Sequence, residues 1–291
     1  MIKGRIIKGI GGFYYVVAAH ALYECRARGL FRKEGRTPLV GDMVDIEPTG
    51  EEGKAYLQDI YERSTELVRP AVANADQALL VFSAASPAVS YGLVDRFLAN
   101  MEEQELDTCL CITKIDLVSE EDIDVIREPY EKAGYKVYIV SNKTKEGIDE
   151  IKAFLKDRNT VLSGPSGVGK SSLIKSIIPD SSVEIGEISQ KIGRGKNTTR
   201  HTEILPIDET SFVYDTPGYS SIELLIKDEA ELGFLMREFR PHLGGCRFAG
   251  CSHLNEPDCI IKQKVEEGVI SPRRYEGYRE MYLDVKGRRK W

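Results

Sequence analysis

The chain has 291 residues and a formal net charge of −6, with 42% apolar and 30% charged residues. This length suggests two or three domains, and the apolar fraction is sufficient for hydrophobic cores. The acidic balance excludes a polycation, so any contact with nucleic acid has to rely on local basic patches. No apolar run approaches the roughly 20 residues of a membrane span, and residues 1–11 lack the apolar block of a secretory signal, so we expect a cytoplasmic protein without a membrane partner.

Residues 1–68 are expected to form a small β-barrel. Short strand-like runs occur at 14–17, 21–25 and 42–46, and glycine-containing turns separate them. Several short strands in fewer than 70 residues fit a Greek-key barrel of the OB type, although the pattern alone leaves an SH3-like barrel open. Arg69-Pro70 marks the expected end of this domain.

Residues 69–224 alternate between strand and helix patterns. The expected strands are 77–82, 108–112, 136–140, 160–162 and 211–214, and the expected helices are 94–105, 122–133 and 147–155. Such alternation predicts a parallel sheet covered by helices. Residues 225–291 are expected to form an α-rich module around a Cys/His cluster. The predicted fold class is therefore α/β, with a β-barrel before the α/β domain and a zinc-binding module after it.

A phosphate-binding loop is the strongest motif in the chain. The run GPSGVGKS at 164–171 matches the P-loop pattern and stands between a predicted strand and a predicted helix. Its glycines let backbone N–H groups point at phosphate oxygens, and the helix N-terminus adds a positive dipole end. Lys170 is expected to reach the β- and γ-phosphates, and the Ser171 hydroxyl to ligate Mg²⁺. The expected phosphate-site residues are Gly164, Gly167, Val168, Gly169, Lys170, Ser171 and Ser172.

Two motifs favour guanine over adenine. Thr113-Lys114-Ile115-Asp116 follows a predicted strand and resembles the N/TKxD motif, in which the Asp accepts from guanine N1–H and N2–H while the Lys stem lies along the base. Ser141-Asn142 follows the next strand, where a backbone N–H commonly meets guanine O6. Both motifs stand at strand ends, where α/β proteins bind ligands. We therefore expect the base to be bound by Thr113, Lys114, Asp116, Ser141 and Asn142.

The order of these motifs along the chain is unusual. Asp215-Thr216-Pro217-Gly218 closes another predicted strand and has the DxxG form, in which Asp215 suits a Mg²⁺ contact and the Gly218 N–H suits the γ-phosphate. Both base motifs precede the P-loop, whereas in ordinary GTPases they follow it. A circular permutation keeps the same spatial site with this order.

Four potential metal ligands cluster near the end of the chain. Cys246, Cys251, His253 and Cys259 form a C-x4-C-x-H-x5-C pattern, which matches a tetrahedral structural zinc site. A reducing cytosol favours metal over disulfides, and four protein ligands leave no position for a catalytic water. Residues 271–291 are basic, and a solvated helix face and an RNA contact account for this equally well.

Taken in this order, the barrel, the permuted GTPase motifs and the Cys₃His module resemble the RsgA/YjeQ family of GTPases that depend on the small ribosomal subunit. The resemblance covers essentially the whole chain, and its most specific features are the motif order, GPSGVGKSSL at 164–173 and the Cys/His spacing. It implies an OB barrel that contacts rRNA, GTP hydrolysis stimulated by the small subunit, and a role in late subunit maturation. The implied ligands are GTP or GDP, Mg²⁺ and Zn²⁺.

The chain departs from the family pattern at switch I and at the guanine motif. Residues 193–200 are similar to the family's switch I, in which Thr199 would ligate Mg²⁺. Asn197 stands where the family has a His implicated in positioning the attacking water, and an amide cannot accept a proton near neutral pH. Thr113 stands where the family usually has Asn. The expected catalytic set is Lys170, Asn197, Thr199, Asp215 and Gly218.

Two other functions remain open. One is an assembly factor that binds GTP but scarcely hydrolyses it, motivated by Asn197 and by Tyr219, which replaces the water-orienting Gln of Ras-like enzymes. The other is a P-loop ATPase or small-molecule kinase with an accessory zinc domain, in which Asp116→Ala would leave nucleotide affinity unchanged. We expect a monomer, since no feature of the sequence indicates an obligate dimer.

Overall fold

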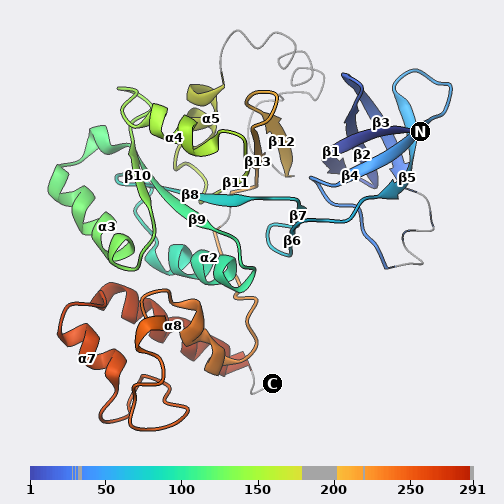
Figure 1. The fold of residues 1–291 in the computed structure, drawn as a ribbon. Helices are drawn as coiled ribbons and strands as arrows, with labels where there is room; N and C mark the ends of the chain where they lie inside the picture. Colours follow the sequence, from blue (N-terminus) through green and yellow to red (C-terminus); the bar gives the residue numbers. More distant parts are fainter. Residues whose placement is uncertain (28, 30, 32–34, 179–201, 219, 289–291) are drawn as a thin grey trace. The chain divides into compact units, whose positions relative to one another are not determined.

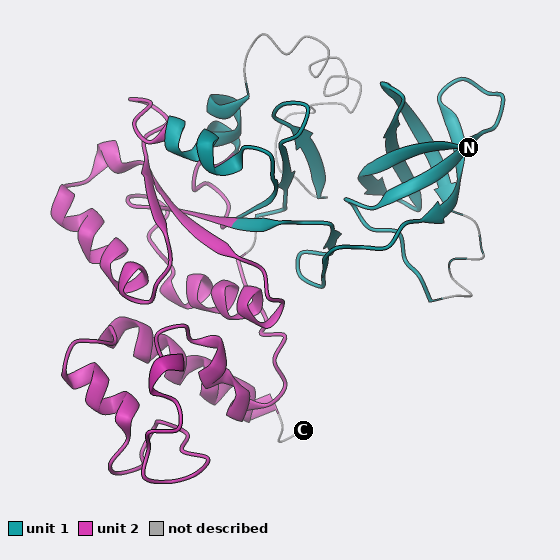
Figure 2. Ribbon diagram, viewed as in Figure 1, with its two compact units in different colours: residues 1–78, 149–163, 171–218 teal, residues 79–148, 164–170, 219–291 magenta. Residues whose placement is uncertain are grey.

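The computed structural model describes residues 1–27, 29, 31, 35–178, 202–218 and 220–288 (Figure 1). They form two compact units that are interleaved along the chain (Figure 2). The first unit comprises residues 1–78, 149–163 and 171–218, and the second comprises residues 79–148, 164–170 and 219–291. The domain limits expected at 68 and 224 stay a prediction.

A five-stranded barrel opens the first unit. Its strands are β1 Ile2–Ile10, β2 Phe13–Ala18, β3 Ala21–Ala27, β4 Met43–Pro48 and β5 Lys54–Ile60. They pair in the closed order β1-β2-β3-β5-β4-β1, in which only the β3–β5 pairing is parallel. This is the OB type, and it resolves the choice against an SH3-like barrel. Ile6, Val16, Val44, Ile46 and Leu57 fill the interior.

The α/β part of the first unit contains β11 Asn159–Ser163, β12 Glu203–Pro206 and β13 Phe212–Asp215. It also contains α4 Ile148–Leu155 and α5 Lys170–Ile177, except that the first residue of each helix belongs to the second unit. β11 and β13 are parallel, as predicted. β12 runs antiparallel to β13 and also pairs with β1, where Lys8 Nζ lies 3.0 Å from Glu203 Oε2. Sequence analysis did not predict β12, and this antiparallel strand joins the sheet to the barrel. A short hairpin, β6 Glu66–Leu67 and β7 Val72–Ala73, follows the barrel.

The second unit carries three further strands of the sheet. They are β8 Gln77–Ser83, β9 Thr108–Thr113 and β10 Val137–Val140, and their order in the sheet is β10-β9-β8. Of these, β9 and β10 pair in parallel. The first two residues of β8 belong to the first unit. Helix α2 Tyr91–Glu103 follows β8, and η1 Ile115–Leu117 and α3 Glu120–Lys132 follow β9. Ser119 and Asp122 form a capping box that fixes the start of α3. β8 and β9 are buried along their whole length, which explains their continuous apolar pattern.

The C-terminal part of the second unit is helical, as expected. It contains η2 Glu229–Leu235, η3 Arg240–His242, α7 Ile260–Glu266 and α8 Pro272–Arg288. Their apolar core includes Ala99 of α2, so the module and α2 share one core. Arg274 is only 1% exposed and pairs with Asp95 and Glu238. The basic residues of 271–291 were expected either to form a solvated helix face or to contact RNA, and neither expectation holds for Arg274. None of the described helices is long and apolar enough to cross a membrane.

Candidate functional site

The phosphate loop has the conformation that its glycines allow. Gly164, Gly167 and Gly169 have φ angles of +147°, +80° and +102°, in the region that side chains disfavour. A Cβ at Gly164 would lie 2.0 Å from the Val81 carbonyl oxygen of β8, so only glycine fits there. Lys170 is 9% exposed, and its Nζ donates to the carbonyl oxygens of Gly164 at 2.6 Å and Pro165 at 2.9 Å. The ammonium group thus lies within the curl of the loop.

The guanine motif is tied to this loop by its first two side chains. Thr113 is fully buried, and its Oγ1 lies within hydrogen-bond distance of the carbonyl oxygens of Phe82 and Val168. Lys114 adopts a left-handed φ of 61°, and its Nζ donates to the Gly167 carbonyl oxygen at 2.8 Å. The structure therefore brings together two motifs that lie about 50 residues apart in sequence.

The loop after β10 orients the carboxylate that is expected to read the base. The buried Ser141 donates from Oγ to Asp116 Oδ1 at 2.7 Å. Ser141 Oγ also accepts from the backbone N–H groups of Lys143 at 3.2 Å and Thr144 at 3.1 Å. Asp116 is itself exposed and so accessible to a ligand. All five predicted base-site residues and Gly164–Lys170 belong to the second unit.

The DxxG motif and residues 171–177 of α5 belong to the first unit. Asp215 is the last residue of β13 and is 7% exposed, whereas Gly218 is exposed. Thr216, which sequence analysis did not single out, donates from Oγ1 to the Leu162 carbonyl oxygen at 2.9 Å and so fixes the motif against β11. Ser171 and Ser172 lie exposed on the first turn of α5. Asn197, Thr199 and Tyr219 fall outside the described residues.

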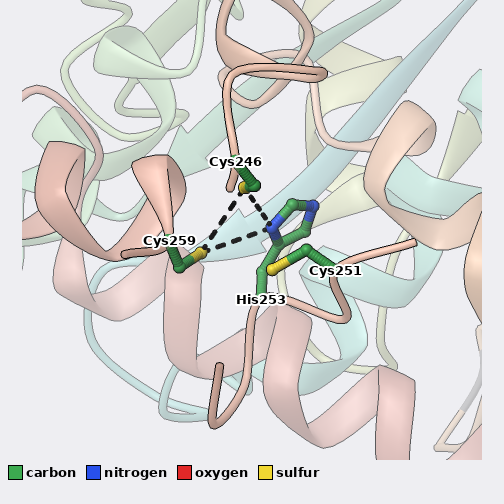
Figure 3. Close-up of side chains that lie close together, drawn as sticks. All are labelled: Cys246, Cys251, His253 and Cys259. Atoms are coloured by element: carbon green, nitrogen blue, oxygen red, sulfur yellow. Dashed lines mark hydrogen bonds between the residues drawn. The ribbon is translucent and has the colours of Figure 1, made fainter. Parts of the chain in front are cut away.

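The four predicted metal ligands converge (Figure 3). His253 Nδ1 lies 3.5 Å from Cys246 Sγ and 3.4 Å from Cys259 Sγ, and the two sulfur atoms lie 3.9 Å apart. All four ligand atoms, including Cys251 Sγ, lie within 4.8 Å of one another. Ligand atoms of a tetrahedral zinc centre lie about 3.8 Å apart for two sulfurs and about 3.6 Å for sulfur and nitrogen. The donor set and its spacing therefore fit zinc.

The surrounding residues hold this site in place. The hydroxyl groups of Tyr275 and Tyr278 donate to the carbonyl oxygens of His253 at 2.7 Å and Ser252 at 2.8 Å. Burial lowers the pKa of His253, although the charge of Glu256 acts to raise it, so the imidazole is neutral and able to ligate metal. The Glu256 carboxylate accepts from the backbone N–H groups of residues 252, 254 and 255. Sequence analysis missed Glu256, because a carboxylate that organises a loop has no motif of its own.

The chain is similar to RsgA proteins over its full length. Residues 60–225 match the RsgA GTPase family model, and residues 3–57 match the model of the RsgA N-terminal domain. The "small ribosomal subunit biogenesis GTPase RsgA" of Agathobacter rectalis is 46% identical, with all of both chains covered, and that of Bacillus subtilis is 42% identical, with 99% of both covered.

Two solved structures are also similar. YjeQ from Thermotoga maritima has a TM-score of 0.79 and 33% identity, with 98% of this chain and 99% of that chain covered. The structure described as "YloQ, a circularly permuted GTPase" has a TM-score of 0.75 and 38% identity, with 99% and 96% covered. The match extends over the permuted order of motifs that the sequence predicted.

Proposed function

The chain belongs to the RsgA GTPase family, and from this membership we propose that it hydrolyses GTP on the small ribosomal subunit, late in the maturation of that subunit. GTP hydrolysis is the activity of the family, which confirms the predicted GTPase over a P-loop ATPase or kinase. The support for the ribosomal partner is that the relatives are named for small-subunit biogenesis.

The observation that carries the nucleotide site is the direct linkage of the guanine motif to the phosphate loop through Thr113 and Lys114. In this proposal Asp116, held by Ser141, accepts from guanine N1–H and N2–H, and the Asn142 backbone N–H donates to O6. The N–H groups of Gly167–Ser171 face the phosphates. Lys170 exchanges its two carbonyl partners for oxygens of the β- and γ-phosphates.

The reaction is an in-line displacement. A water oxygen bonds to the γ-phosphorus, and the bond from that phosphorus to the β,γ-bridging oxygen breaks, which leaves GDP and phosphate. Lys170 and the Gly218 N–H stabilise the negative charge on the transferred group. Mg²⁺, for which Ser171, Thr199 and Asp215 are the proposed ligands, would neutralise charge between the β- and γ-phosphates. Asn197 can orient the water but not deprotonate it, so slow turnover without the subunit follows.

The remaining parts of the chain have supporting roles in this proposal. Cys246, Cys251, His253 and Cys259 hold a structural Zn²⁺. The OB barrel contacts rRNA, and the protein acts as a monomer. A cytoplasmic location is part of the same proposal, and its support is that the relatives are named for small-subunit biogenesis.

Asp116→Asn tests the guanine site. Xanthine carries a carbonyl oxygen where guanine has its 2-amino group, so the amide of the variant would pair with xanthine and not with guanine. We expect the wild type to prefer GDP over XDP and Asp116→Asn to reverse this preference. Asp149→Asn is the matched control, because that carboxylate is 93% exposed on α4. An unchanged GDP-to-XDP affinity ratio in Asp116→Asn would contradict the site.

Co-sedimentation tests the proposed partner separately. We expect the protein to pellet with purified small ribosomal subunits when a non-hydrolysable GTP analogue is present, and less with GDP. Equal recovery with small subunits, large subunits and no subunits would contradict the ribosomal role, whatever the nucleotide result.

A further inference from the structure

Lys8 of the barrel faces the sheet rather than the barrel interior. In a regular strand, side chains two residues apart share a face, so Lys8 would point into the barrel with Ile6, which is fully buried in its core. The register of β1 against β2 shifts between Ile6 and Lys8, and a β-bulge of this kind re-aims the side chains around it. Lys8 Nζ consequently donates to Glu203 Oε2 of β12 at 3.0 Å.

Glu203 stands between Lys8 and the carboxylate of the DxxG motif. It is the cross-strand partner of Lys8 on β1 and of Asp215 on β13, and both pairings are antiparallel. Directly opposed residues of antiparallel strands project from the same face of a sheet, with Cβ atoms about 5 Å apart. The three side chains therefore form a row across β1, β12 and β13, in which one cation is followed by two carboxylates. All three residues belong to the first unit.

The two neighbouring carboxylates of this row repel each other. Like charges that stand directly opposite in a sheet are destabilising. Solvent screens this repulsion only in part, because Asp215 is 7% exposed and the side chain of Glu203 is 23% exposed. The ammonium group of Lys8, whose side chain is 15% exposed, compensates the charge of Glu203. The net charge beside Asp215 is therefore close to zero as long as the Lys8–Glu203 pair is intact.

We propose that Lys8 is a positioning residue for the phosphate site: by pairing with Glu203 it prevents a second negative charge from acting beside Asp215, and so favours the binding of GTP over GDP. The proposal rests on the nucleotide site proposed above, in which Asp215 and Gly218 lie near the γ-phosphate. The γ-phosphate is the negatively charged group that GDP lacks. A Glu203 carboxylate without its cation would therefore weaken the binding of GTP more than the binding of GDP.

Other contacts hold the end of β13 independently of Lys8. Tyr214, which precedes Asp215, is fully buried and donates from its hydroxyl group to the Ala73 carbonyl oxygen at 2.9 Å. Thr216, which follows Asp215, donates from Oγ1 to a backbone carbonyl oxygen of β11 at 2.9 Å. Because these contacts fix the strand on both sides of Asp215, loss of the Lys8 ammonium group changes the charge of the row more than the position of the strand.

A double-mutant cycle tests the proposal. The affinities of the full chain for GTPγS and for GDP are measured by calorimetry with Mg²⁺ in excess, and their ratio is compared between variants. We expect Lys8→Met to lower this ratio about fivefold, the effect of one uncompensated charge in a partly solvated site. Glu203→Gln leaves Lys8 as an uncompensated cation and should raise the ratio by a similar factor. The double variant should return to the wild-type ratio, because the row then again has only the charge of Asp215.

A purely structural tether between the barrel and the sheet would give a different pattern. Both single substitutions break the same ion pair, so loss of a tether predicts changes of the same sign in both variants and no recovery in the double variant. That pattern, or a ratio that neither substitution changes, would overturn the proposal. Lys8→Arg keeps the charge and should keep the wild-type ratio, and the sign of the Glu203→Gln effect decides the question if Lys8→Met does not fold.

Two controls separate this proposal from the site on which it rests. Lys54→Met is the matched control, because Lys54 pairs with Glu51 on the same barrel but its side chain is 55% exposed, and it should leave the ratio unchanged. Asp215→Asn should itself change the ratio. If it did not, the proposed place of Asp215 in the nucleotide site would be wrong, which is a distinguishable failure.

Discussion

Arg274→Met should loosen the C-terminal module without a direct effect on the nucleotide site. The Arg274 guanidinium donates from Nε to Glu238 Oε1 at 2.8 Å and from Nη1 to Asp95 on α2. The side chains of Arg274 and Asp95 are each 1% exposed, and that of Glu238 is 4% exposed. Solvent screening is therefore negligible, and two carboxylates depend on one buried cation.

Removing one partner of a buried ion pair costs about 3–5 kcal/mol, because the remaining charge is left uncompensated. We expect native-state hydrogen exchange to show a loss of this size in the opening free energy of α8. Burial raises the pKa of Asp95, and the charge of Arg274 counteracts this shift. A raised native pKa means that the folded state binds the proton more tightly than the unfolded chain, so the variant should recover stability as pH falls from 8 toward 5.

Arg273→Met provides the matched control on the same helix. Arg273 Nη2 lies 3.6 Å from Asp95 Oδ2, but its side chain is 30% exposed, so we expect a loss below about 1 kcal/mol. Equal effects of the two substitutions, or a loss that does not depend on pH, would refute the reasoning. Asp95→Asn combined with Glu238→Gln and Arg274→Met should restore much of the stability, because no net charge then remains buried.

Three further outcomes follow from the site geometry. Lys170→Ala should weaken GDP binding about 10- to 100-fold, measured by calorimetry, because it removes charge-assisted hydrogen bonds to phosphate. Gly164→Ala should abolish nucleotide binding, because its Cβ would lie 2.0 Å from a backbone carbonyl oxygen of β8. Chelation of Zn²⁺ should expose the half-buried Cys246 to maleimide at pH 8, detected by mass spectrometry, whereas the buried Cys25 and Cys109 should stay unlabelled. Burial raises their pKa values to about 12 and about 11, so their labelling should accelerate only as pH rises toward those values.

The convergence of the candidate base-site and metal-ligand residues was predictable, because these residues are local runs at fixed positions in the fold. The carboxyl ends of parallel strands meet at one edge of a sheet, so motifs after β9 and β10 had to lie close together. The Cys/His spacing likewise confines four ligands within 14 residues. The orientation of side chains such as Asn142 could not be predicted from the sequence. It depends on the turn that the Lys145 N–H closes by donating to the Ser141 carbonyl oxygen.

The missed features depend on distant partners. β1 escaped prediction because Lys3, Arg5 and Lys8 interrupt its apolar pattern, and its pairing with β2, β4 and β12 compensates for this. Gly4 is needed there because a Cβ would lie 2.6 Å from Val16 Cγ1. Arg274 resembles its exposed basic neighbours in sequence, and its partner Asp95 lies 179 positions earlier. Charge patterning along one helix cannot show such a pairing.

Phosphate release from GTP and from ATP, with and without purified small ribosomal subunits, tests the central claim most directly. The account predicts hydrolysis that is selective for GTP, slow for the protein alone and increased steeply by the subunits. Hydrolysis of ATP at an equal rate, or GTP binding that the subunits never convert into phosphate release, would contradict it.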